Sequence, residues 1–241
     1  MTCRRIAGFI GVAILTASAF LLSVPIQSAS ADPCPDVEAV FARGTSEAPG
    51  VGGVGQAFVD ALRGQAEGKS VGVYPVNYPA SSDFGGGIEF AGTVIEGIRD
   101  AAAHVQATAA NCPKTRIVLG GFSQGAVVAG FVTSAVVPEG VPAALVPAPM
   151  PPEVADHVAA VTLFGKPSDE FLRQYEAPAL TIGPLYAAKT IDLCAQGDSI
   201  CDGAPGGQPG FAHISYGFNG MTAQAATFAS DRIAPMPPST G

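Results

Sequence analysis

Short apolar runs alternate with amphipathic stretches along most of the chain, and this alternation predicts strands separated by helices. The five expected strands are residues 37–42, 71–76, 116–119, 158–164 and 189–193. The main expected helices are residues 52–64, 88–110, 124–136 and 221–233. Strands that alternate with helices in this way predict an α/β fold built on a parallel sheet.

The apolar faces of these elements indicate how they pack. Residues 158–164 are apolar apart from Thr162, which is typical of a strand that helices cover on both faces. The long helix expected over residues 88–110 repeats apolar residues along one face, and we expect that face to point into the core. The side chains concerned are Phe90, Val94, Ile95 and Ile98.

Two stretches fit neither pattern. Residues 138–152 hold six prolines among small apolar residues, and residues 167–188 hold apolar side chains without a clear period. Both could border an apolar binding site, and both could equally be surface loops that pack on the core. The sequence leaves open which interpretation holds and whether either stretch covers a site.

The N-terminus has the pattern of a secretory signal peptide. Arg4 and Arg5 precede an apolar run over residues 6–24, and the small residues of an A-x-A cleavage site follow it. The run approaches the length of a membrane span, so a transmembrane anchor is the alternative. We expect cleavage between Ala31 and Asp32 and secretion of the remainder.

The chain is therefore expected to consist of a signal peptide, residues 1–31, and one domain, residues 32–241, whose last eight or so residues fray. The whole chain has a formal charge of −8, and removal of Arg4 and Arg5 makes this about −10. An acidic chain without basic clusters argues against nucleic acid as a partner. No later segment is apolar enough over a sufficient length for stable membrane insertion. We expect a monomer.

Five cysteines occur, and Cys3 is expected to leave with the signal peptide. The four that remain, Cys34, Cys112, Cys194 and Cys201, predict two disulfides in an exported protein. Three pairings are possible, and the simplest joins Cys34 to Cys112 and Cys194 to Cys201. A zinc site is the alternative, but neither a C-x2-C pair nor a nearby histidine pair supports one.

The most informative local pattern is Gly121-Phe122-Ser123-Gln124-Gly125, which follows an apolar run and precedes a helical one. A serine in G-x-S-x-G between a strand and a helix lies on a sharp turn that raises its hydroxyl above the sheet. The pattern predicts a nucleophile at Ser123. By itself it also fits an ordinary glycine-rich turn, so other residues must decide.

A serine hydroxyl needs a base to take its proton, and the base needs a carboxylate to orient it. Of the three histidines, His104 is expected on the surface of a helix and His157 at the opposite edge of the sheet. His213 lies in a loop just before the last helix and follows the serine in the chain. Its position makes it the expected base.

The acid is expected between the serine and the histidine in the chain. Asp198 lies directly after the fifth expected strand, between Cys194 and Cys201, where a short disulfide would restrict its carboxylate. Asp192, within the strand, and Asp202, beyond the bridge, are its rivals. A turn aspartate without catalytic work is the alternative interpretation of Asp198.

A serine that attacks a carbonyl group also needs hydrogen-bond donors for the oxyanion that forms on the substrate. Gln124, the residue after the nucleophile, is expected to offer its backbone N–H. The loop after the first strand is expected to supply the second donor, and Thr45 has both a backbone N–H and a hydroxyl. Arg43 and Glu47 are expected to brace this loop.

Together these residues resemble the cutinase family of serine esterases. The points of similarity are the loop from Arg43 to Glu47, the pentapeptide at Ser123, Asp198 between two cysteines, His213 followed by Tyr216, and the long-range pair Cys34–Cys112. The resemblance spans nearly the whole of residues 32–241. It implies a compact α/β-hydrolase fold with a five-stranded parallel sheet covered by helices on both faces.

The resemblance also implies the chemistry. Ser123, Asp198 and His213 would form the catalytic triad, and Thr45 and Gln124 the oxyanion hole, without a metal or organic cofactor. The implied substrates are short- to medium-chain carboxylic esters. Lipase, phospholipase or thioesterase activity on longer lipids is the alternative within enzymes. A non-catalytic, secreted surface-binding protein on the same scaffold is the alternative of another class.

Two features depart from the family pattern. Phe122 stands where the family often has tyrosine, which is a minor change. Residues 138–152 form a longer segment than we expect for the compact members without a lid. Such a segment could cover part of the cleft and change the chain-length preference.

Overall fold

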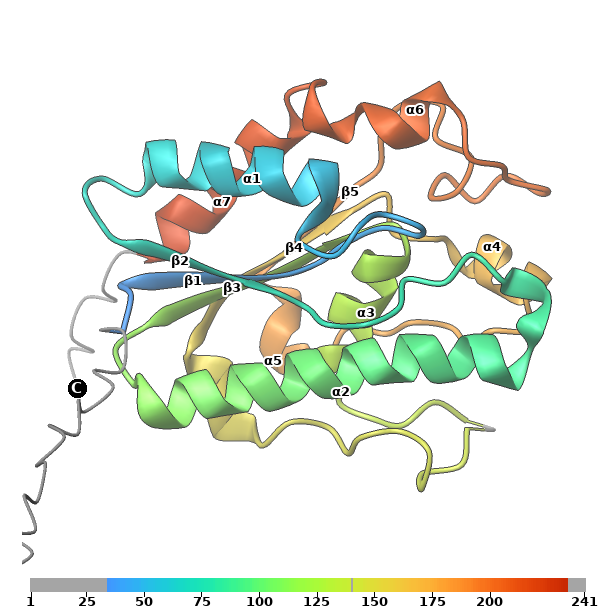
Figure 1. The fold of residues 1–241 in the computed structure, drawn as a ribbon, viewed down its shortest axis with the longest axis horizontal. Coiled ribbons are helices and arrows are strands. Elements are labelled where there is room, and N and C mark those ends of the chain that lie inside the picture. The colour runs from blue at the N-terminus through green and yellow to red at the C-terminus, as the bar shows by residue number, and fades with distance from the viewer. Residues whose placement is uncertain (1–33, 140, 234–241) are drawn as a thin grey trace, which may run out of the picture. The chain divides into compact units, whose positions relative to one another are not determined.

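A five-stranded sheet lies at the centre of the fold, with the strand order β2-β1-β3-β4-β5 and every neighbouring pair parallel (Figure 1). The strands are β1 (Val37–Ala42), β2 (Val71–Pro75), β3 (Arg116–Phe122), β4 (Val158–Phe164) and β5 (Thr190–Leu193). The computed structural model describes residues 34–139 and 141–233. The expected signal peptide and the expected frayed end therefore lie outside the described residues.

Helices cover the sheet on both faces, as expected from the sequence. In Figure 1, α1 and α7 lie on one face, and α2 and α3 lie on the other. The α-helices are α1 (Gly52–Gln65), α2 (Ile88–Asn111), α3 (Gln124–Val132), α4 (Asp169–Gln174), α5 (Pro184–Ala187), α6 (Phe211–Ile214) and α7 (Met221–Ile233). The short 3₁₀ turns are η1 (Phe84–Gly86), η2 (Pro152–Asp156) and η3 (Ser215–Gly217). None of the helices in the described part of the chain has both the length and the apolar character of a membrane span.

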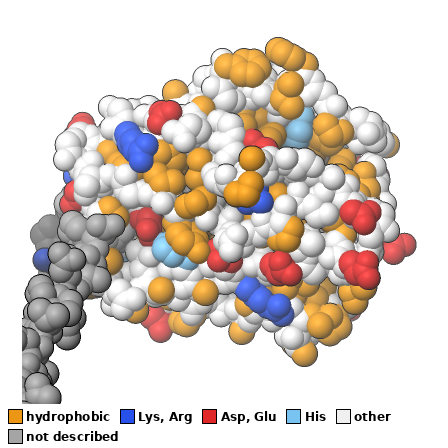
Figure 2. All heavy atoms as spheres, viewed as in Figure 1, with side chains coloured by type: hydrophobic (Ala, Val, Ile, Leu, Met, Phe, Trp, Pro, Cys, Tyr) orange, Lys and Arg blue, Asp and Glu red, His pale blue; other side chains and the backbone are white. Residues whose placement is uncertain are grey.

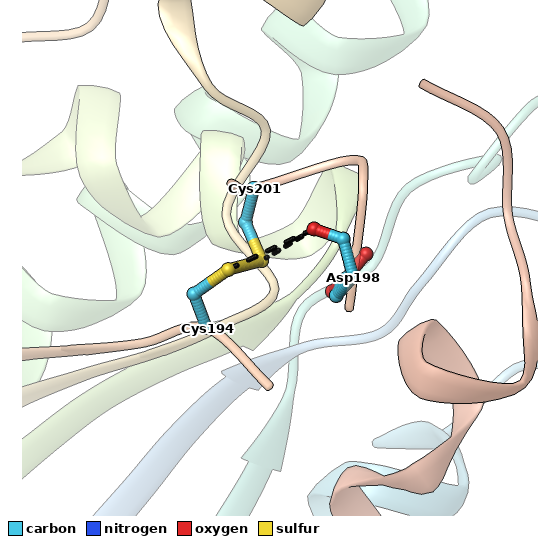
Figure 3. Close-up of side chains that lie close together, drawn as sticks. All are labelled: Cys194, Asp198 and Cys201. Atoms are coloured by element: carbon cyan, nitrogen blue, oxygen red, sulfur yellow. Dashed lines mark hydrogen bonds between the residues drawn. A yellow bond between two sulfur atoms is a disulfide. The ribbon is translucent and has the colours of Figure 1, made fainter. Parts of the chain in front are cut away.

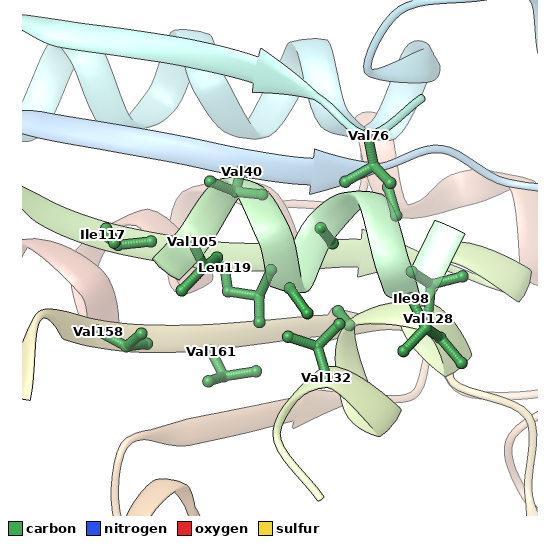
Figure 4. Close-up of a cluster of buried hydrophobic side chains, with 14 of the residues drawn as sticks. Val40, Val76, Ile98, Val105, Ile117, Leu119, Val128, Val132, Val158 and Val161 are labelled. Carbon is green, nitrogen blue, oxygen red and sulfur yellow. The ribbon is translucent and has the colours of Figure 1, made fainter. Parts of the chain in front are cut away.

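The sheet separates two hydrophobic clusters because successive side chains of a strand point to opposite faces. In β1, Val40 belongs to the cluster beneath α2 and α3, whereas Ala39 and Phe41 belong to the cluster beneath α1 and α7. Figure 4 shows the first cluster, in which Val40 and Leu119 from the sheet lie near Val105 of α2. The two clusters explain why the central strands are largely apolar on both faces.

The strand order reverses direction between β1 and β3, because the chain adds β2 on one side of β1 and β3 on the other. β1 pairs with β2 on one side and with β3 on the other, so the loops after β1 and β3 open a crevice at this edge. Thr45 follows β1, and Ser123 follows β3. The topology therefore brings these two sequence-distant loops to one end of the sheet.

The helix after β3 is shorter than the sequence predicted. It was expected to extend to Val136, but α3 ends at Val132. The Thr133 hydroxyl donates to the Gly130 carbonyl (2.7 Å), and the Thr133 carbonyl accepts from the Gly183 N–H (2.9 Å). Threonine can satisfy backbone groups in this way in place of the next helical turn.

The expectation for the inner face of α2 was only partly right. Ile98 is buried in the core and Val94, which is partly buried, packs against it, whereas Phe90 and Ile95 are partly buried and lie outside the core cluster. All four side chains also line a large cavity. Helical periodicity identifies an apolar face of a helix, but it does not distinguish a face that packs on the core from a face that lines a cavity.

Candidate active site

Ser123 lies on the turn between β3 and α3, in a backbone conformation that few non-glycine residues adopt (φ 54°, ψ −117°). Such a conformation costs about 1–3 kcal/mol and persists only where the surroundings enforce it. The turn is tight enough that only glycine is accommodated on either side of Phe122 to Gln124. A Cβ on Gly121 would lie 2.1 Å from the Gly125 carbonyl oxygen, and a Cβ on Gly125 would lie 2.0 Å from the Ala42 carbonyl oxygen. Both glycines are thus required by close approach of the backbone.

The serine hydroxyl begins a hydrogen-bonded chain of three side chains. His213, in α6, places its Nε2 2.9 Å from the Ser123 Oγ. Its Nδ1 lies 2.9 Å from one carboxylate oxygen of Asp198 and 3.0 Å from the other. His213 and Asp198 are both buried, whereas Ser123 is partly accessible. The accessible end of the chain is therefore the hydroxyl.

Asp198 is held as a carboxylate by its partners. Burial raises the pKa of this group, but hydrogen bonds from His213 and the Tyr216 hydroxyl (2.6 Å), together with the Ile200 N–H (3.1 Å), outweigh burial. The net effect lowers the pKa below its usual value of 3.8. Asp198 is thus ionised at neutral pH and can hold the Nδ1 proton of His213.

A disulfide closes the loop that carries Asp198. Cys194 and Cys201 are bonded, as are Cys34 and Cys112, which is the simplest of the three possible pairings. Figure 3 shows the Asp198 carbonyl oxygen directed at the Cys194–Cys201 sulfurs, at 3.8 and 3.5 Å. Because the sulfurs are bonded to each other, this group of residues offers no thiolate to a metal ion.

Tyr216 has a role that the sequence reasoning did not identify. It is fully buried, donates to Asp198 and accepts from the Ala195 N–H (2.9 Å). Burial and the neighbouring carboxylate raise the pKa of its hydroxyl, which therefore stays protonated as a donor. The tyrosine three residues after His213 was visible in the sequence, but nothing local indicated that its hydroxyl would reach the loop of Asp198.

The loop after β1 is stabilised mainly by Glu47. Its carboxylate accepts from the Gly44 N–H (2.6 Å) and the Gly53 N–H (2.7 Å), and the Arg43 Nε donates to the Glu47 carbonyl oxygen (2.8 Å). Arg43 thus braces the loop through the backbone of Glu47 and not through its carboxylate. This network positions Thr45 at the wall of the cavity that contains Ser123.

Thr45 and Gln124, the expected oxyanion donors, line the same cavity as Ser123. Gln124 opens α3, where the first backbone N–H groups of a helix have no partner within it. Within residues 34–139 and 141–233, the backbone N–H groups of Thr45 and Gln124 make no hydrogen bond to another protein group. The Gln124 side chain is held away by a bond from its Nε2 to the Ser81 carbonyl (3.0 Å).

The rival residues lie elsewhere. His157 precedes β4, at the other end of the sheet, and Asp192 pairs with Lys166 (3.3 Å). Asp202 is exposed and accepts from the Ala204 N–H. His104 was expected on the surface of its helix, but it is partly buried and its Nε2 lies 3.0 Å from the Glu38 carboxylate.

A cavity of about 1,210 Å³ opens at Ser123 and His213. Its walls are mostly apolar and come from α2, α3, the proline-rich segment after α3, the α4 region and the end of α6. Both stretches that the sequence left unassigned, residues 138–152 and 167–188, contribute to it. A large cavity with mostly apolar walls is suited to a ligand with an apolar part.

Known proteins share these features. The family model described as Cutinase matches residues 33–233. Carboxylesterase Culp1 of Mycobacterium tuberculosis is 51% identical over 237 residues, which cover 97% of this chain and 98% of the relative. Phospholipase Culp4 of the same organism is 44% identical over 230 residues, covering 95% and 92%.

A solved structure gives the same result. The structure of Trichoderma reesei cutinase in complex with a C11Y4 phosphonate inhibitor superposes with a TM-score of 0.63 at 28% identity. The superposition covers 85% of this chain and 79% of the other. Sequence, fold and family model agree over the same residues, and the chain belongs to the cutinase family.

Proposed function

We propose that this protein is a serine carboxylic ester hydrolase with Ser123 as the nucleophile, His213 as the base and Asp198 as the group that orients the base. One observation carries this proposal: the unbroken hydrogen-bonded chain from the Ser123 hydroxyl through both ring nitrogens of His213 to the Asp198 carboxylate. This hydrogen-bonded chain ends at the Ser123 hydroxyl, which borders the apolar cavity, so a substrate carbonyl in the cavity can reach it.

The reaction follows from the positions of the protons. The Ser123 oxygen bonds to the ester carbonyl carbon as its proton passes to the His213 Nε2, and Asp198 stabilises the imidazolium that results. The imidazolium then donates its proton to the leaving alcohol, and the acyl group remains on Ser123. Water attacks this acyl-enzyme with His213 again as base, and the carboxylic acid leaves.

Charge develops on the substrate oxygen in both steps. The unpartnered N–H groups of Thr45 and Gln124 support a role for these residues as the oxyanion hole. The Gln124 N–H also lies at the N-terminus of α3, where the helix dipole favours a negative charge. A donor of this kind contributes about 100- to 1,000-fold to the rate of such enzymes.

The names of the relatives support the same reaction class. Culp1 is a carboxylesterase, and the matched Trichoderma structure holds a phosphonate. Culp4 is a phospholipase, which favours lipid esters as a second candidate class of substrate. The apolar walls of the cavity support either class, and both use the same three residues.

We also propose that the protein is exported and works outside the cell. The signal-like N-terminus and two disulfides support this location, because disulfides persist in oxidising compartments. N-terminal sequencing of protein recovered from culture medium tests the proposal. A mature chain that begins at Asp32 is expected, and retention of Met1 in the cell fraction would contradict it.

The catalytic proposal is tested by Ser123→Ala with hydrolysis of p-nitrophenyl butyrate and labelling by a fluorophosphonate. Ser123→Ala should lose about 10⁴-fold or more in kcat/KM and all labelling. Ser82→Ala is the matched control, because Ser82 is exposed and lies outside the cavity lining. Wild-type protein that is neither labelled nor active would favour the non-catalytic surface-binding alternative.

A further inference from the structure

The cavity extends well beyond the three residues of the catalytic chain. One stripe of α2 lines it over more than three helical turns, with apolar residues at alternating spacings of three and four. The stripe consists of Ile88, Ala91, Ile95, Ile98 and Ala102. With a rise of 1.5 Å per residue, these residues form a wall about 21 Å long.

The proline-rich segment after α3 forms the opposite wall. Val141, Leu145, Val146 and Met150 all line the cavity, and Met150 also packs against the core beneath α2. Figure 1 shows this segment running alongside α2, on the side away from the sheet. We call the space between the α2 stripe and residues 141–150 the α2 groove.

The wall of the α2 groove formed by residues 141–150 is held in place by hydrogen bonds. The Arg99 guanidinium, on α2, donates to the Leu145 carbonyl (2.5 Å), and the Leu145 N–H donates to the Pro142 carbonyl (2.9 Å). Prolines lock further backbone angles along this wall. A wall that is already ordered loses little entropy when a ligand binds, and this preorganisation favours binding.

The α2 groove is chemically uniform. Among the described residues that line the whole cavity, the charged side chains are Glu47, Glu176 and the His213 imidazole when protonated. The carboxylate of Glu47 is already bonded to two backbone N–H groups of its own loop. A ligand with many hydrogen-bonding groups would leave them unpaired along these walls, at a cost in free energy for each.

We infer that the α2 groove binds the acyl chain of a long-chain ester while the ester carbonyl lies at Ser123. The inference rests on the proposed ester hydrolysis and names its substrate class. Three observations support this occupant over a peptide or a sugar: the groove belongs to the same cavity as the Ser123 hydroxyl, it follows one helix over about 21 Å, and its walls are mostly apolar.

The surface around the cavity is consistent with a lipid substrate. Ile88, at the start of α2, is exposed, as are Ile214 and Phe218, which also line the cavity. Figure 2 shows hydrophobic side chains gathered over α6 and over the segment alongside α2. These exposed side chains offer apolar surface to an acyl chain beside the cavity.

The inference makes a quantitative prediction for chain length. Each methylene that the α2 groove buries should raise kcat/KM about fourfold, which corresponds to about 0.8 kcal/mol. The rise should continue beyond butyrate to at least dodecanoate. It is measured with p-nitrophenyl esters of four to twelve carbons, each below its aggregation threshold, so that interfacial effects do not contribute.

The decisive variant narrows the α2 groove. Ala91→Trp places an indole against the opposite wall and should lower the dodecanoate-to-butyrate ratio of kcat/KM at least tenfold. Ala103→Trp is the matched control, because Ala103 is exposed on the same helix and lies outside the cavity lining. The control should keep the wild-type ratio.

A second variant guards against a folding defect at Ala91. Ile95→Gln makes the middle of the stripe polar without added bulk, and it should lower the same ratio while thermal unfolding shows a folded protein. A wild-type profile that falls from butyrate upward, or a ratio that neither variant changes, would overturn the inference. Loss of butyrate hydrolysis in the wild type would instead contradict the proposed function.

Discussion

Among the described residues, two histidines each pair with a carboxylate, and the two pairs differ in what surrounds them. His213 and Asp198 lie at the carboxyl end of the sheet, with 2.9 Å between nitrogen and oxygen. His104 of α2 and Glu38 near the start of β1 are 3.0 Å apart. Both carboxylates have a lowered pKa, because hydrogen bonds outweigh the effect of burial. Distance and charge therefore do not distinguish the two pairs.

The second ring nitrogen does distinguish them. His213 bonds Asp198 through Nδ1 and Ser123 through Nε2, so a proton can pass along the ring. In the other pair, the Nε2 of His104 faces both Glu38 and the Thr108 hydroxyl (3.3 Å). The Thr108 hydroxyl donates a hydrogen bond to the Glu38 carboxylate (2.8 Å), so its proton is directed away from the His104 ring nitrogen.

The surroundings complete the contrast. The Tyr74 ring stacks on the His104 ring at a centroid distance of 3.4 Å, and neither His104 nor Glu38 lines the cavity. Ser123 and His213 both border it. Of the two pairs, only His213–Asp198 has a ring nitrogen bonded to an accessible hydroxyl, so we expect chemistry at that pair and a structural role for His104–Glu38.

The largest difference is expected between the two histidines. His213→Gln removes the proposed base and should lower kcat/KM for p-nitrophenyl butyrate by about 10⁴-fold or more. His104→Gln should stay within about twofold of the wild type, because it removes only a contact between α2 and β1. Far-ultraviolet circular dichroism serves as the control for folding of both variants. Equal losses of activity would contradict the comparison.

The two carboxylates should differ next. Asp198→Asn keeps the shape but cannot hold the imidazolium, and kcat should fall by about 10³- to 10⁴-fold. Glu38→Gln should leave kcat within about twofold and lower the free energy of unfolding by about 1–3 kcal/mol, since it weakens charged hydrogen bonds. Urea unfolding and steady-state kinetics measure the two effects. A loss of activity in Glu38→Gln would mean that the His104–Glu38 pair affects catalysis at His213, and it would contradict the comparison.

Much of the fold was predictable from the chain because each strand had a local signature. The largely apolar sequence of β4 indicated that helices cover this strand on both faces, and the structure places helices on both faces of the sheet. The fold class was confirmed on this basis. Local pattern sufficed because strand and helix periods depend on neighbouring residues alone.

The candidate site was predictable in its residues but not in its supports. Ser123 and His213 stood in recognisable positions along the chain, and their catalytic roles stay predictions. The bond from Tyr216 to Asp198 spans 18 positions in sequence, and that from Glu38 to His104 spans 66. Contacts of this kind depend on how strands and helices pack, which no local pattern records.

The α2 groove shows that the packing of apolar side chains was also only partly predictable from the sequence. Ile95 and Ile98 repeat at helical spacing, and the pattern predicted that both face the core. Ile98 is buried in the core and only borders the cavity, whereas Ile95 lines the cavity and is not part of the core. Whether an apolar stripe is covered depends on where residues 141–150 lie, and their proline-rich sequence carries no periodic signal.

A smaller effect is expected from the two tyrosines that donate to carboxylates. Tyr216→Phe removes the donor to Asp198, and kcat should fall about 10- to 100-fold with little change in KM, because the positioning of His213 is weakened. Tyr74→Phe removes the bonds to Asp100 (3.1 Å) and should leave both constants unchanged. A rise in KM without a fall in kcat for Tyr216→Phe would mean that Tyr216 shapes the cavity and does not position Asp198.

The smallest effect concerns acid stability at the His104–Glu38 pair. The pKa of Glu38 in the folded protein lies below its usual value of 4.5, so its ionised form stabilises the fold above that pH. This contribution is lost as the pH falls through the lower, folded value. The difference in unfolding free energy between the wild type and Glu38→Gln should therefore shrink as urea titrations move from pH 7 to about pH 3. Glu153→Gln, at an exposed position, is the control and should show no such trend. A difference that stayed constant over this range would mean that Glu38 acts through packing, and that its charge contributes nothing at this end of the sheet.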